Sequence, residues 1–101
     1  MATRRRVVWA RSARRHLDEI VEFIARDSSE GARRVVEQAL AAARSLETLS
    51  DRGRVVPERA DPTIREVFVY RYRLIYRTTG DTVAVIAFIH GARDFERRRR
   101  A

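Results

Sequence analysis

Residues 64–93 constrain the fold of this chain more than any other stretch. They read IREVFVYRYRLIYRTTGDTVAVIAFIHGAR. Apolar residues nearly alternate with polar ones from Glu66 to Thr78, whereas the run from Val83 to Ile89 is continuously apolar, as in a strand covered on both faces. Thr79-Gly80-Asp81 offers a turn between them, since glycine accepts positive φ. We therefore expect three consecutive antiparallel strands, with the most buried strand last.

A first helix is predicted before this sheet. Residues 5–9 are β-prone and favour an edge strand. The next apolar residues recur at the spacing of one helix face, which predicts a helix from Ser12 to Arg26 with Ser12 as its N-cap. Those residues are Leu17, Ile20, Val21 and Ile24.

A second helix is predicted after the break at residues 27–29. Ser28 can cap it, and Glu30 suits the positive end of its dipole. Gly53 is a plausible stop, although most of the helix should lie before residue 50. Its apolar stripe consists of Ala32, Val35, Val36, Ala39, Leu40, Ala43 and Leu46.

Together these elements predict an α+β fold of order β-α-α-β-β-β in a single domain spanning residues 1–101. Two helices joined by a short turn form a hairpin, and a small antiparallel sheet is the surface available to bury its apolar face. Residues 51–62 are expected to be a loop, and the basic tail at 96–101 to fray. We expect Leu40 and Ile86 in the shared core, and Arg73 on an open sheet face with Leu74 and Tyr76 toward the helices.

The net charge of +8 indicates an acidic partner. All 22 basic residues are arginine, which stays charged and has a planar fork suited to phosphate or carboxylate. Residues 11–51 carry seven arginines against eight acidic residues, whereas residues 52–77 carry seven against three. The excess therefore lies on the sheet, its entry loop and the tails, and the partner is either nucleic acid or an acidic protein segment.

Composition excludes several kinds of site. Cysteine is absent, and the two histidines lack metal-ligand spacing, so we expect no metal site and no cofactor. The early apolar run is too short for a membrane span, so we expect a soluble, cytoplasmic protein with no membrane contact.

Some polar residues allow two interpretations. His90 ends the last strand, where it is either satisfied by a backbone group or acts as a general acid or base. Glu58 and Glu66 are either bases or salt-bridge partners of nearby arginines. His16, between basic residues, is expected at the surface.

The aromatic residues near the middle of the sheet are equally open. Tyr70 and Tyr72 flank Arg71, and such a cluster either stacks on bases or consists of ordinary strand aromatics. The Tyr70-Arg71 turn itself lacks the glycine or asparagine that a two-residue hairpin usually requires.

In order and spacing, the chain resembles the RelE/ParE superfamily of type II toxin–antitoxin toxins over roughly residues 6–95. The resemblance rests on four runs, SARRHLDEIVEFIARD, GRVVPE, IREVFVYRYRLIYR and VIAFIHGARDF. It implies a growth-inhibiting, plasmid-stabilising toxin in a heteromeric complex with a cognate antitoxin. RelE-type members cut messenger RNA on the ribosome, whereas ParE-type members inhibit DNA gyrase.

The resemblance assigns residues to each activity. If the chain is RelE-like, Arg73, Arg93, His90 and Arg65 would be catalytic. However, Val67 occupies the position of a RelE lysine, and GARDFERRRRA has no tyrosine, which favours the ParE-like activity. Under either activity, the antitoxin or target would bind through Arg65, Arg71, Arg73, Tyr70 and Tyr72. A basic nucleic-acid-binding module remains a third alternative.

Overall fold

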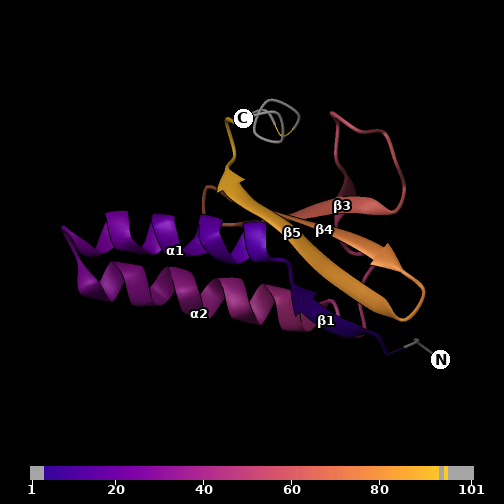
Figure 1. The fold of residues 1–101 in the computed structure, drawn as a ribbon, viewed down its shortest axis with the longest axis horizontal. Coiled ribbons are helices and arrows are strands. Elements are labelled where there is room, and N and C mark those ends of the chain that lie inside the picture. Colours follow the sequence, from indigo (N-terminus) through magenta and orange to yellow (C-terminus); the bar gives the residue numbers. More distant parts are fainter. Residues whose placement is uncertain (1–3, 94, 96–101) are drawn as a thin grey trace.

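The computed structural model describes residues 4–93 and 95 of the chain, which form two helices and five strands (Figure 1). No helix in this described part is both long and apolar enough to cross a membrane. In chain order the elements are β1 (Arg6–Trp9), α1 (Arg11–Ala25), α2 (Ser29–Ser45), β2 (Arg54–Val55), β3 (Ile64–Val69), β4 (Tyr72–Thr79) and β5 (Thr82–His90).

The five strands form one sheet in the order β1-β5-β4-β3-β2. The predicted antiparallel meander of β3, β4 and β5 is confirmed, and Gly80 has a φ of +56° in the turn between β4 and β5. The sheet is mixed because β1 pairs in parallel with β5, with Arg6 opposite Thr82. The α+β class is confirmed, but β2 is a short strand inside the segment that the sequence predicted as a loop.

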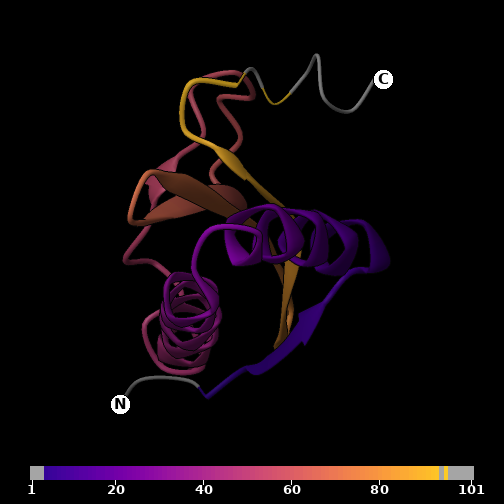
Figure 2. The same cartoon turned by 90° about the vertical axis from the view of Figure 1, so that its left-hand side faces the viewer.

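The two helices form the predicted hairpin on one face of the sheet (Figures 1 and 2). Both predicted apolar stripes contribute to the core between helices and sheet, with Leu17 and Leu46 among its buried members. The prediction for Leu40 was wrong, because its side chain is 43% exposed on the outer side of α2. On the sheet, Leu74 and Tyr76 face the helices as predicted.

The two helices begin differently. Ser28 caps α2 as predicted, since its Oγ accepts a hydrogen bond from the Gly31 N–H at 2.9 Å. Ser12 is not the cap of α1, because the helix begins at Arg11 without a side-chain cap. Instead, the Ser12 hydroxyl donates a hydrogen bond to the Ile86 carbonyl at 3.0 Å.

The prediction that Ile86 lies in the shared core with the helices was wrong, and a bulge in β5 occurs at this residue. Ile75 lies opposite Ala87 but Tyr76 lies opposite Val85, which leaves Ile86 as the extra residue. An extra residue reverses the alternation of side chains along a strand. Accordingly, Val85 faces the helices before the bulge and Phe88 faces them after it, while Ile86 packs on the other face.

The face of the sheet opposite the helices is covered in part and is not open as predicted. A second, smaller core lies there, and its coverage comes from the loop before β3 and from the chain after β5. Val56 supplies the loop side of this core, and Phe95 supplies the other side. The remaining buried members are Ile64, Ile75, Ala87 and Ile89.

A buried tyrosine fixes the loop between α2 and β2. The Tyr76 hydroxyl donates to the Ser50 carbonyl at 2.7 Å and accepts from the Gly53 N–H at 3.0 Å. A Cβ on Gly53 would lie 2.6 Å from that hydroxyl oxygen, so the close approach requires glycine. Burial also raises the pKa of Tyr76 above its ordinary value.

Candidate functional site

Arg73 lies at the centre of an ion-pair network on the sheet face opposite the helices. Its Nε donates to Glu66 Oε1 at 2.6 Å, and its two terminal nitrogens donate to the two Glu58 carboxylate oxygens at 2.8 Å each. Glu66 also pairs with the Arg54 Nε at 2.5 Å. The salt-bridge interpretation of Glu58 and Glu66 is therefore confirmed.

Burial distinguishes this network from a surface site. Arg73 lies on the predicted face of its strand, but it is only 3% exposed and does not present its charge to solvent as predicted. The Arg73 hydrogen bonds lower the pKa of Glu58 to about 2, and the Glu58 carboxylate in turn raises the pKa of Arg73. Glu58 is therefore a fixed anion at neutral pH and a poor general base.

The network also holds the chain that follows β5. Arg73 Nη1 donates to the Arg93 carbonyl at 2.8 Å, and Glu58 Oε2 accepts from the Phe95 N–H at 3.0 Å. These bonds position Phe95 over the second core. The contacts of Arg73 are thus those of a structural residue.

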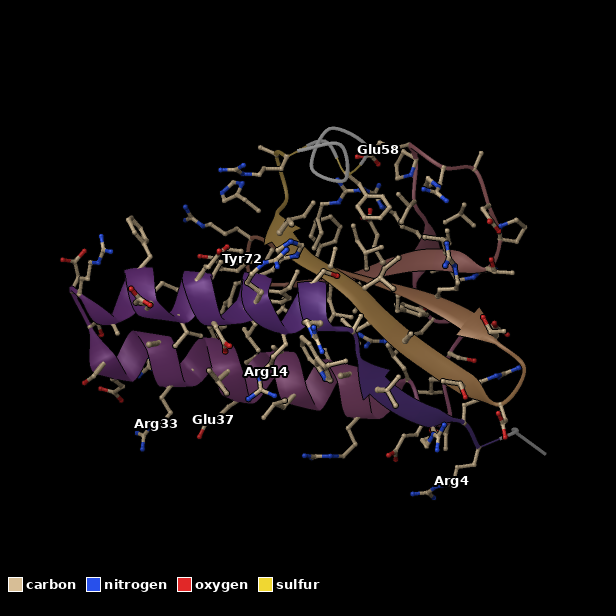
Figure 3. All side chains as sticks on the ribbon, in the orientation of Figure 1. Arg4, Arg14, Arg33, Glu37, Glu58 and Tyr72 are labelled. Atoms are coloured by element: carbon tan, nitrogen blue, oxygen red, sulfur yellow. The ribbon has the colours of Figure 1, made fainter. Side chains whose placement is uncertain are left out.

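His90 and Arg93 line a different site, beside α1, although the Arg93 carbonyl contacts Arg73. They line a hollow of about 310 Å³ together with Tyr72, whose ring stacks on Phe88 with centroids 5.4 Å apart. The His90 Nδ1 accepts a hydrogen bond from the Ala92 N–H at 3.1 Å, as the backbone-satisfied interpretation predicts. Figure 3 shows Tyr72 next to α1 and Glu58 on the other side of the sheet.

His16 lines the same hollow and was wrongly predicted at the surface. It is 8% exposed, and its Nδ1 accepts a hydrogen bond from the Phe88 N–H at 3.2 Å. Its position between Ala13 and Ile20 on the inner stripe of α1 was the sequence signal for burial. Its basic neighbours obscured that signal.

The four residues that a RelE-like nuclease would require are not gathered in one site. Arg65 donates to the backbone carbonyls of Pro62 and Gly53, at 3.0 Å each, and so ties the loop to β3. Arg73 is closed within its network, whereas His90 and Arg93 line the hollow beside α1. Their catalytic role stays a prediction that this arrangement does not favour.

Tyr70 and Arg71 form the two-residue loop between β3 and β4, with Val69 opposite Tyr72. Both side chains are exposed, so these two predicted binding residues are accessible to a partner. Tyr70 takes the positive φ that the loop requires, at +55°. Tyr72 is half-buried against Phe88 and is less accessible.

A groove beside β1 was not predicted from the sequence. It measures about 290 Å³ and lies where α1, α2 and β1 meet. Leu40, which the core does not use, forms part of its wall, and Arg14 lies at its polar edge. The lining residues are Trp9, Arg14, Leu17, Asp18, Val21, Val36 and Leu40.

No group of three or more His, Asp or Glu side chains that could hold a metal ion occurs within residues 4–93 and 95.

Comparison with known families identifies the chain. The profile of the family described as ParE toxin of type II toxin-antitoxin system, parDE, matches residues 7–95. The chain belongs to the ParE toxin family. This match confirms the resemblance to the RelE/ParE superfamily and assigns the chain to its ParE family.

A solved structure supports the fold of this ParE-family toxin. The chain from the chromosomal ParDE toxin–antitoxin system of P. aeruginosa superimposes with a TM-score of 0.69 at 18% sequence identity. The match covers 85% of the present chain and 95% of that chain. No curated relative matches the sequence significantly.

Proposed function

We propose that this ParE-family toxin inhibits DNA gyrase by binding it, without cleaving nucleic acid, and that a cognate antitoxin neutralises it in the cytoplasm. The toxin would then arrest growth in cells that lose the antitoxin. The toxin and antitoxin together would thereby stabilise a plasmid that encodes both. The observation that supports a binding inhibitor is the closure of Arg73 within its ion pairs with Glu58 and Glu66.

A nuclease needs a proton-transfer group and a cation at the same phosphate. Here the donors of Arg73 point at two carboxylates and one backbone carbonyl. His90 and Arg93 line one hollow beside α1, but Arg73 and Arg65 are not among its lining residues, so the set of four that the RelE-like activity implies is not assembled there. A binding inhibitor has no such requirement, and its positive surface speeds association with an acidic partner.

The groove beside β1 suits the antitoxin. Within the described residues, β1 pairs only with β5, so its outer edge can accept an added strand. Leu40 is exposed on the wall of the groove beside that edge, and an amphipathic helix continuing from the strand would bury it. A heteromeric complex with an acidic antitoxin segment follows, since the chain carries +8.

Side-chain exposure limits which arginines we propose as contacts of the antitoxin. Arg71 and Arg14 both have exposed side chains, and Arg14 lines the groove beside β1, where it can pair with an antitoxin carboxylate. Arg65 is committed to backbone carbonyls, and Arg73 is buried. We therefore propose Arg14, in place of Arg73, as an ion-pair partner of the antitoxin, and Arg71 as a contact of the target.

A supercoiling assay with purified gyrase tests this function. Toxin should inhibit supercoiling at near-stoichiometric amounts, and prior addition of the antitoxin should restore it. The control variant Arg33→Ala should inhibit supercoiling as the wild-type toxin does, because Arg33 is exposed on α2 and lines neither the groove nor the hollow beside α1. Unimpaired supercoiling together with toxin-dependent cutting of ribosome-bound messages would replace gyrase inhibition with the RelE-like activity.

A further inference from the structure

Three large apolar side chains are exposed together at the end of the sheet near the loop between β3 and β4. Leu49 is 57% exposed, Phe68 52% and Tyr70 60%. They line one hollow of about 420 Å³ between α2 and the end of β3. We refer to these three residues and their hollow as the tip surface. Clustered exposed apolar residues of this size mark interaction sites.

The backbone at Tyr70 adds an independent observation. Its φ of +55° lies in the left-handed region, which glycine adopts without a steric cost and tyrosine does not. The Tyr70 ring is mostly exposed, so burial of the ring within this chain does not offset that cost. Strain held by a solvent-exposed aromatic residue is characteristic of a functional position.

Arginines surround the tip surface. Arg52 lies on the rim of the hollow and is held there by a 2.8 Å hydrogen bond to Ser45 Oγ. Arg71 follows Tyr70 in the loop, and the Arg54 guanidinium lies over the Phe68 ring at 5.4 Å. None of the described residues that line the hollow is acidic. An acidic surface is therefore the electrostatic complement.

We propose that the tip surface is the contact with the toxin's target, and that the target is a folded protein presenting an apolar side chain flanked by carboxylates. This inference rests on the proposed function, since gyrase is its expected target. Aromatic residues and arginine at the centre of a contact are typical of interfaces whose affinity comes from a few residues.

A protein surface fits the tip surface better than a nucleic-acid strand does. Ala41 and Ala42 of α2 contribute small aliphatic side chains to the wall of the hollow, which leaves room for a branched side chain of a partner. Stacking of successive bases requires several open aromatic faces. Arg54 already covers one face of Phe68, which leaves Tyr70 as the more open ring at this surface.

The tip surface is separable from the antitoxin groove. The two hollows share no lining residue, because one lies between α2 and β3 and the other beside β1. A substitution in either hollow can therefore impair one partner and spare the other.

The test compares Tyr70→Gly with a matched variant in the groove, Leu40→Asp, in the full-length chain. Gyrase and antitoxin binding are each measured by calorimetry in about 0.1 M salt, where surface charges are least screened. Tyr70→Gly should weaken gyrase binding at least about tenfold, keep antitoxin affinity, and unfold thermally at or above the wild-type temperature. Leu40→Asp should weaken antitoxin binding and keep gyrase affinity.

Three results would overturn the proposal. One is wild-type gyrase affinity in Tyr70→Gly, and another is loss of both partners at an unchanged unfolding temperature, because the tip surface would then not be a separate contact for the target. The third is loss of affinity for a single-stranded oligonucleotide with gyrase binding unchanged, which would assign the tip surface to nucleic acid.

Failure of the proposed function gives a different pattern. If the wild-type toxin arrests growth but does not bind gyrase, growth arrest becomes the readout for the tip surface. Loss of arrest in Tyr70→Gly then supports the tip surface with another target protein, and retained arrest overturns it. A wild-type chain that neither binds gyrase nor arrests growth overturns both proposals.

Discussion

The two faces of the sheet are built on different principles. The helix-side face is an apolar core in which α1, α2 and the strands each contribute side chains at regular spacing. The opposite face combines a small apolar cluster with the buried charges of Arg73 and Glu66. Its cover comes from a loop and from the chain after β5, which lack regular spacing.

This difference determines how each face should respond to substitution. Hydrophobic burial is tolerant of small changes in packing, whereas a buried ion pair depends on every partner being present. Arg73 joins β4 to the loop through Glu58 and to the chain after β5 through the Arg93 carbonyl. The opposite face therefore joins the loop and the chain after β5 to the sheet through the contacts of Arg73. The two hollows lined by exposed apolar side chains instead include residues of the helices.

The largest expected effect comes from breaking the ion pairs of Arg73 with Glu58 and Glu66. Arg73→Ala removes one of the two arginine partners of Glu66, a carboxylate with no exposed surface, together with the partner of Glu58, and should destabilise the chain by about 3–5 kcal/mol. Chemical denaturation measures this loss. The control Arg71→Ala, at an exposed loop position, should change stability by less than about 0.5 kcal/mol. Equal effects of the two substitutions would contradict the distinction.

The helix-side core should respond according to burial. Leu46 has no exposed surface, and Leu46→Ala should cost about 2–5 kcal/mol. Leu40→Ala, at the groove wall, should cost well under about 2 kcal/mol because much of its surface is already in contact with water. Denaturant midpoints of the two variants give the comparison, and a larger loss for Leu40 would invert the proposed packing.

Acid should reduce the stability that the sheet face opposite the helices contributes. The folded-state pKa of Glu58 is about 2, below its ordinary value of 4.5, because Arg73 hydrogen-bonds the ionised form. A depressed carboxyl pKa contributes stability that is complete above about pH 4.5 and is lost as pH falls toward 2. Glu58→Gln should therefore be less stable than wild type at neutral pH and should lose less between pH 4.5 and 2 in denaturation curves. Parallel wild-type and variant curves would refute this role.

The smallest expected effect is a gain in folding stability. Tyr70→Gly relieves a left-handed tyrosine and should stabilise the chain by about 1 kcal/mol or less, because the greater freedom of glycine in the unfolded chain offsets part of the relief. Differential scanning calorimetry measures it. Arg71→Gly is the matched control, since the structure gives no positive φ at Arg71, and it should not stabilise.

The sequence predicted the helix-side face well because its information is local. Apolar spacing located both helices, and Gly80 located the turn between β4 and β5. It did not predict the parallel pairing of β1 or the bulge at Ile86, because both depend on contacts between distant segments. The hydrogen bond from Ser12 to the Ile86 carbonyl is another contact between distant segments that local spacing does not reveal.

The candidate site was predicted less well for the same reason. Arg73 was correctly placed on the face away from the helices, but alternation along a strand does not reveal that Glu58 would close over it from a loop. Pairing of Glu66 with arginine was one of two interpretations that the sequence allowed, and the structure selects it. Tyr70 and Arg71 were accessible as expected, and the missing glycine in their turn was a sign of strain that the structure locates at Tyr70, with its positive φ.

Mapping RNA 5′ ends in cells that express the toxin without antitoxin tests most directly whether the chain acts by binding or by cleavage. With Arg73 closed in its network and separated from His90, growth should stop without new 5′ ends in translated messages. New ends at a fixed codon position, absent from Arg93→Ala and His90→Gln, would contradict a binding inhibitor and establish a ribosome-dependent nuclease.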